Sequence, residues 1–87
     1  MKQRIAETKG LTERFCLQYD VVGDEENGYG IEITLIEDGN KTTERCSGIT
    51  NCYFYAKKLA KELASEAVFP VHLEDIVRDV MSDWKVF

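Results

Sequence analysis

The chain has 87 residues and a formal charge of −5, because 16 acidic side chains outnumber 11 lysines and arginines. This length predicts a single domain over residues 1–87 with one hydrophobic core. The acidic balance argues against nucleic-acid binding, which depends on cations that neutralise phosphates, and no apolar run approaches the roughly 20 residues that cross a membrane.

Two segments in the first half of the chain alternate apolar and polar side chains, which predicts half-buried strands. They are residues 14–22, RFCLQYDVV, and residues 29–37, YGIEITLIE. The side chains expected in the core are Phe15, Leu17, Tyr19, Val21, Tyr29, Ile31, Ile33 and Leu35. The side chains expected on the opposite, open face are Arg14, Cys16, Gln18, Asp20, Gly30, Glu32, Thr34 and Ile36.

Two polar segments are expected at the edges of this sheet. The pair Asp38-Gly39 tolerates the positive φ of a tight hairpin, and residues 41–45, KTTER, supply a third strand with almost no apolar face. Such a strand is typical of a sheet edge, where charges protect unpaired backbone groups. Residues 3–8 are expected at the other edge, with Ile5 pointing inward. The result is an antiparallel meander of three to four strands.

Two helices are expected after the strands. The first covers residues 51–67, with Thr50 or Asn51 accepting hydrogen bonds from the free amides of its first turn. Its expected buried stripe is Cys52, Ala56, Leu59, Ala60, Leu63 and Ala67. Pro70 then interrupts the chain, and a second helix covers residues 72–84. Its expected inward side chains are Leu73, Ile76, Val77, Val80 and Trp84.

Both helices are expected on one face of the sheet, because so short a chain cannot supply two cores. The sequence therefore predicts an α+β fold in which an antiparallel meander sheet precedes two helices, in the order β-β-β-β-α-α.

The cysteines and the single histidine are the residues that most resemble a chemical site. Cys46 and Cys52 are too far apart in sequence for a zinc knuckle, and Cys16 is expected on the other face of the sheet, so we expect no metal. Cys52 is expected in the core, where a thiol is inert, and His72 begins the other helix. We therefore expect no catalytic residue, no cofactor and no enzymatic activity.

The odd number of cysteines and the absence of a leader sequence predict reduced thiols and a cytoplasmic protein.

An aromatic side chain is expected on the outer side of the first helix. Phe54 lies nearly opposite the buried stripe and shares its side with Lys57, Lys58 and Lys61. An exposed aromatic ring among lysines can anchor a partner or a stacked base. The alternative is a later helix start, which would let Phe54 and its neighbouring tyrosine tuck beneath the corner.

Two apolar side chains interrupt the open face of the sheet. If Cys16 and Ile36 lie near one another, they form the centre of a small patch suited to self-association or to a partner. The possible interaction surface therefore consists of this pair together with the Phe54 side of the first helix.

Three segments resemble a known family. They are YGIEI at residues 29–33, the pair ER that leads through Gly48-Ile49 into a helix, and FPVHLEDIVRDVMSDW at residues 69–84. The chain from Tyr19 onward resembles a family of short uncharacterised proteins, a domain of unknown function from anaerobic Gram-positive bacteria. The resemblance implies a cellular context and no catalytic residue, and the cysteines are not part of it.

Two functions of different classes remain. The favoured one is a small non-catalytic interaction module that binds an unknown protein partner, or a second copy as a homodimer, through a strand edge, the open sheet face or the Phe54 side. The alternative is a small enzyme or ligand-binding domain with a pocket between helices and sheet. A cavity with His72, or with a cysteine beside a carboxylate, would favour the alternative, whereas a filled core and an exposed apolar patch would favour the module.

Overall fold

The computed structural model describes residues 1–9 and 14–84, and side chains as far as residue 80. The strands are β1 (Lys2–Lys9), β2 (Phe15–Asp24), β3 (Gly28–Glu37) and β4 (Asn40–Thr50). They are followed by α1 (Tyr53–Ser65), the short 3-10 helix η1 (Pro70–His72) and α2 (Leu73–Trp84). The predicted α+β order is confirmed.

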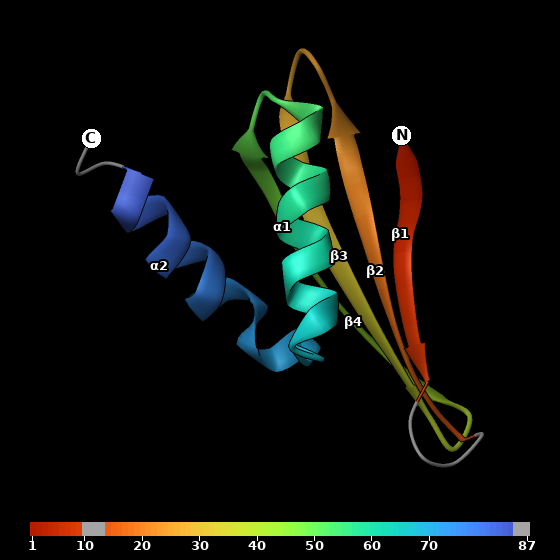
Figure 1. The fold of residues 1–87 in the computed structure, drawn as a ribbon. Helices are drawn as coiled ribbons and strands as arrows, with labels where there is room; N and C mark the ends of the chain where they lie inside the picture. Colours follow the sequence, from red (N-terminus) through yellow and green to blue (C-terminus); the bar gives the residue numbers. More distant parts are fainter. Residues whose placement is uncertain (10–13, 85–87) are drawn as a thin grey trace.

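The strands form one antiparallel sheet in the order β1-β2-β3-β4, so β1 and β4 are its edges (Figure 1). Strands β2 and β3 pair without interruption, whereas β1 shifts register between Arg4 and Ala6. Such a bulge bends and twists an edge strand. The β3–β4 hairpin turns through Asp38 and Gly39, whose φ values are 51° and 84°, in agreement with the turn predicted from their sequence.

Strand β4 is longer than the predicted segment 41–45 and continues to Thr50. It stays paired with β3 as far as the pair formed by Tyr29 and Thr50, after one shift in register. Gly30 permits the close approach of the two strands there, since a Cβ at that position would lie 2.1 Å from the carbonyl oxygen of Cys46. Residues 46–50 show no apolar alternation, and this pattern does not predict that the strand extends beyond Arg45.

Helix α1 covers one face of the sheet (Figure 1). Its buried side chains are Ala56, Leu59, Ala60 and Leu63, the centre of the predicted stripe. The sheet contributes fully buried side chains at the predicted positions Leu17, Tyr19, Val21, Ile31 and Ile33. Ile5 is partly buried against the same core, as predicted. The hydroxyl of Tyr19 donates a hydrogen bond to the Val68 carbonyl at 3.0 Å, which ties the connection after α1 to the sheet.

The ends of the predicted buried stripe are wrong. Cys52 and Ala67 are exposed, because the helix covers only Tyr53–Ser65 and neither residue occupies a helical position. Cys52 is the extended N-cap residue, and Ala67 has a φ of 51°. The predicted capping by Thr50 or Asn51 is wrong, because no side chain caps the first turn; the hydroxyl of Thr50 instead accepts a hydrogen bond from the amide of Cys52, the N-cap residue.

Helix α2 lies beside the edge strand β4 and points away from the sheet (Figure 1). Leu73 and Val77 are buried as predicted, while Ile76 and Val80 are half-buried. The predicted burial of Trp84 concerns a side chain outside those that the structure describes. The first turns of α2 are thus held against β4, and a pocket lies where the two elements meet.

Candidate functional site

The structure separates the predicted interaction residues into two surfaces. Cys16 and Ile36 are direct cross-strand partners on the open face, and both are half-buried. Their neighbours on the two edge strands are Lys9 and Lys41. The apolar row is therefore only two residues wide, with a lysine at each end. Its use as an interaction surface stays a prediction.

The second surface surrounds Phe54, on the side of the molecule that carries the helices. Phe54 is 76% exposed, and its ring packs edge-to-face on Tyr53 with centroids 5.7 Å apart. The helix does begin later than Asn51, but only Tyr53 turns toward the core, so the alternative in which Phe54 tucks beneath the corner is wrong. Lys58 and Lys61 are exposed and Lys57 is half-buried.

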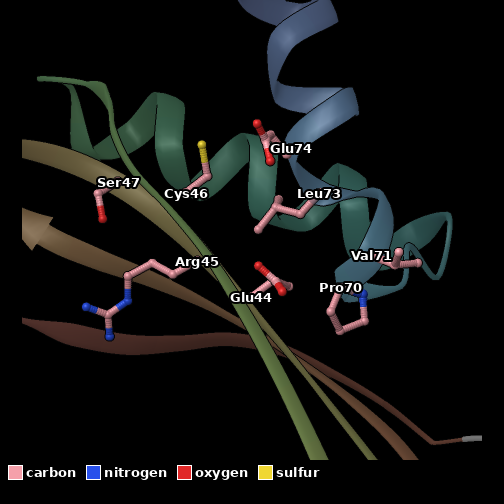
Figure 2. A pocket seen from close by; sticks show the side chains of 8 residues that line it. All are labelled: Glu44, Arg45, Cys46, Ser47, Pro70, Val71, Leu73 and Glu74. Atoms are coloured by element: carbon pink, nitrogen blue, oxygen red, sulfur yellow. The ribbon is translucent and has the colours of Figure 1, made fainter.

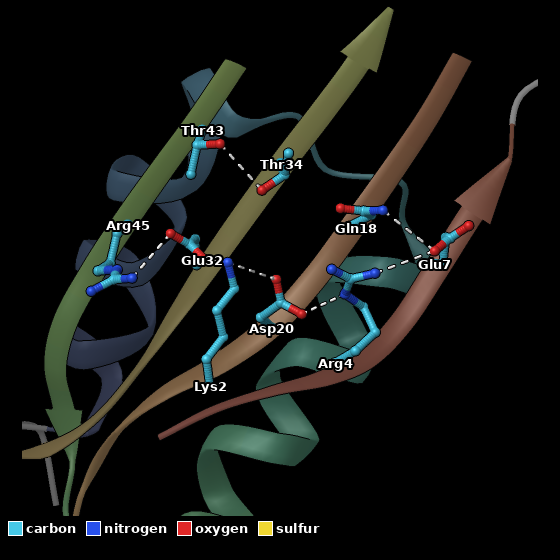
Figure 3. A network of polar contacts seen from close by, with 9 residues as sticks. All are labelled: Lys2, Arg4, Glu7, Gln18, Asp20, Glu32, Thr34, Thr43 and Arg45. Atoms are coloured by element: carbon cyan, nitrogen blue, oxygen red, sulfur yellow. Dashed lines mark hydrogen bonds and ion pairs between the residues drawn. The ribbon is translucent and has the colours of Figure 1, made fainter. Parts of the chain in front are cut away.

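The centre of the open face carries two carboxylates, at positions where the alternation of side chains predicts them. Asp20 and Glu32 are cross-strand partners, yet they are only 1% and 6% exposed. Basic side chains cover them (Figure 3). Arg4 Nε donates to Asp20 and an Arg45 NH2 group donates to Glu32, while Lys2 Nζ lies 2.7 Å from Glu32 and 4.0 Å from Asp20.

This carboxylate row, defined as Asp20 and Glu32 with Lys2, Arg4 and Arg45, is a structural device. Burial by itself would raise the pKa of Glu32, but the hydrogen bonds and charges of Lys2 and Arg45 outweigh it and lower that pKa. A general acid at neutral pH needs a raised pKa and a proton to give. Glu32, with its pKa lowered between two cations, lacks both, so its contacts are suited to stabilising the sheet.

A pocket of about 370 Å³ lies on the side of β4 that carries the helices, away from the carboxylate row. Here the edge strand faces η1 and the start of α2 (Figure 2). Its lining residues are Glu44, Arg45, Cys46, Ser47, Pro70, Val71, Leu73 and Glu74. Pro70 starts the 3-10 turn that brings α2 back to the strand, and buried Leu73 anchors the helix. We call this space the β4–α2 groove.

Two carboxylates face the groove from opposite walls. Glu44 projects from β4 and Glu74 from α2, with Leu73 between them and Pro70 beside Glu44 (Figure 2). Arg45 also borders the groove, but its guanidinium turns away toward Glu32 on the open face, at 3.2 Å. The groove therefore combines apolar walls with an excess of negative charge.

Cys46 contributes a thiol to the lining of the groove. Burial, and then the charge of Glu74, raise the pKa of its thiol. A nucleophilic cysteine needs the opposite shift and a neighbouring base. His72 is exposed and does not line the groove. A cysteine does lie beside a carboxylate here, which is the feature that would favour an enzyme, but the raised pKa of the thiol makes it a weaker nucleophile at neutral pH than catalysis requires.

The three cysteines do not meet. Cys16 lies on the open face, Cys46 lines the groove and Cys52 is exposed at the start of α1, and all three are free. Within residues 1–9 and 14–84, no three cysteine, histidine or acidic side chains are grouped as metal ligands.

The sequence did not identify the groove. The sequence predicts the end of a polar strand at Arg45 and the start of a helix at His72. Each interpretation is locally sound, but no local signal shows that these two segments lie side by side.

Comparison with known proteins identifies a family and no nearer relative. The model of a family of unknown function, DUF6514, matches residues 2–83. This match confirms the resemblance to a domain of unknown function. No curated protein and no solved structure matches the chain. In the part of the chain that the structure describes, neither helix is long and apolar enough to cross a membrane.

Proposed function

The chain belongs to this family of unknown function, and we propose that it is a small non-catalytic interaction module whose β4 edge binds an extended segment of a partner protein. One observation carries the proposal: the β4–α2 groove lies between an edge strand and the start of a helix. A strand added to β4 would run through this groove. Its backbone would supply affinity, and one side chain would enter the pocket and supply specificity.

The backbone of β4 is suited to this role. It is an 11-residue strand that pairs with β3 on one side, and no described strand pairs with its other side. In an antiparallel ladder every second residue directs its N–H and C=O groups away from the partner strand. These groups form the row of donors and acceptors that an added strand uses.

The other edge of the sheet is a poorer template. Strand β1 shifts register between Arg4 and Ala6, so its longest regular stretch is only residues 6–9, whereas β4 is regular over residues 40–46 before its own shift. A bulge breaks the regular spacing of edge groups, so the longer regular stretch offers the better template. We therefore assign the partner to β4.

The chemistry of the groove supports binding over catalysis. The thiol of Cys46 has a raised pKa, because of burial and the nearby charge of Glu74, and no histidine lines the groove. The other close pair of acids, Asp20 and Glu32, is neutralised by cations on the open face. The groove therefore offers no thiol of lowered pKa with a neighbouring histidine, and the lowered pKa of Glu32 does not suit a general acid.

The test uses Cys46 as a reporter of occupancy. Because the chain has three cysteines, a Cys16→Ser, Cys52→Ser variant retains only the thiol in the groove. A pool of short peptides of alternating β-branched and variable residues is added, and alkylation of Cys46 by iodoacetamide is followed by mass spectrometry. We expect the peptide pool to slow alkylation severalfold.

The matched control retains only Cys16, the other half-buried thiol, in a Cys46→Ser, Cys52→Ser variant. Its alkylation should not respond to the peptides, since Cys16 lies on the open face. Unchanged labelling of Cys46, or equal slowing of both thiols, would refute binding in the β4–α2 groove.

A further inference from the structure

We infer that the segment bound at β4 is basic, and that it places a lysine or arginine side chain in the β4–α2 groove between Glu44 and Glu74. This inference rests on the proposed function, because it names the chemistry of the ligand that the same groove selects. It follows from the charges of the two walls, from the apolar surface between them, and from the fact that no described cation directs its charge into the groove.

The two carboxylates are available to a ligand. Glu44 makes no ion pair with any other residue of the described chain. Glu74 accepts a hydrogen bond from Arg78 at 3.2 Å, but both side chains are largely exposed. Such a surface pair contributes little to stability, so Arg78 can share Glu74 with an incoming cation at small cost.

The cation that could neutralise the groove from within is directed elsewhere. Arg45 borders the groove, yet its guanidinium binds Glu32 in the carboxylate row on the open face. The carboxylate of Glu32 holds it there through a charge-assisted hydrogen bond at 3.2 Å. The carboxylate row thus keeps the groove negative by retaining Arg45 on the other side of β4.

The apolar wall fits the stem of a long basic side chain. Val71 is 74% exposed at the mouth of the groove, and buried Pro70 and Leu73 form the surface behind it. Lysine and arginine cover such surfaces with their methylene groups while the charged end reaches polar partners. The thiol of Cys46, kept neutral, adds to this apolar surface.

Other side chains fit less well. A neutral apolar side chain would cover part of both carboxylates without giving them a partner, and an acidic one would add a third negative charge. The amino end of α2 favours anions, but Glu74 and Asp75 in its first turn offset that field.

The experiment compares three peptides that differ only at the central residue, which is lysine, norleucine or glutamate. Binding is measured as protection of Cys46 from alkylation in the Cys16→Ser, Cys52→Ser variant. We expect the lysine peptide to bind about five- to tenfold more tightly than the norleucine peptide, as two weak ion pairs would give, and the glutamate peptide to bind most weakly.

Two substitutions locate the effect. Glu44→Gln should remove most of the lysine preference, whereas Glu37→Gln, which changes an exposed strand glutamate at the β3–β4 hairpin, should leave it unchanged. Equal loss of preference in both variants would show a general effect of net charge and would overturn the inference.

The outcomes separate the inference from the proposed function. If the lysine and norleucine peptides protect Cys46 equally, strand addition stands and the basic preference is wrong. If none of the peptides protects Cys46, the proposed function itself fails. If free butylamine protects Cys46 as well as the lysine peptide does, the pocket recognises amines without an added strand, and the assignment of a peptide ligand is overturned.

Discussion

Replacing Arg4 by methionine should destabilise the fold more than replacing its partner Asp20 by leucine. The pair is asymmetric, because Asp20 is 1% exposed whereas the Arg4 side chain is 42% exposed. Without Arg4, the buried carboxylate keeps only Lys2 at 4.0 Å, and we expect a cost of about 1.5 to 3 kcal/mol for the lost charge-assisted hydrogen bond.

Replacing Asp20 instead leaves only the charge of Arg4, and this side chain is already partly in water. In Asp20→Leu, Arg4 remains exposed and still pairs with Glu7 at 3.3 Å, so we expect a change within about 1 kcal/mol. Urea unfolding followed by circular dichroism measures both variants. Lys9→Met is the control, since Lys9 lies on the same edge strand without an ion pair to another described residue. A neutral Arg4→Met, or an Asp20→Leu that costs more than Arg4→Met, would refute the reasoning.

Three further predictions concern stability. Tyr19→Phe should cost about 1 to 2 kcal/mol, because it leaves the Val68 carbonyl without its donor, and an unchanged urea midpoint would contradict this. The pKa of Glu32 is lowered in the fold, so its contribution is present at neutral pH and is lost as the pH falls through that lowered pKa. Glu32→Gln should therefore lose less stability on acidification than the wild type, and parallel pH profiles would show that Glu32 does not contribute. Chelators and reducing agents should leave the melting temperature unchanged, because the free cysteines lie apart, and a large decrease with either would show that a metal ion or a disulfide stabilises the fold.

The alternation of side chains predicted the sheet well because it reflects which face of a strand meets the core. It identified β2, β3 and the buried centre of α1, and Pro70 marked the break before α2. Alternation does not report exposure, however. Asp20 and Glu32 are on the predicted face and are nonetheless buried, because basic side chains from both edge strands fold over them.

The groove could not be predicted either, because it is formed by two segments that lie far apart in the sequence. It depends on the contact between β4 and the start of α2, and neither segment carries a sign of the other. A helix that begins at residue 51 places Cys52 in the core, but the helix starts at Tyr53, which leaves Cys52 exposed. A boundary error of two residues was enough to misplace a thiol.

Hydrogen exchange of the β4 backbone amides tests the central claim most directly. The protein is compared with and without the lysine-centred peptide, and exchange is followed residue by residue by nuclear magnetic resonance. Strand addition predicts that peptide binding slows exchange at alternate amides of β4, Asn40–Thr50, while the amides of β1 exchange as before. Slowed exchange confined to β1 or to the Phe54 end of α1, with β4 unchanged, would contradict the proposed function.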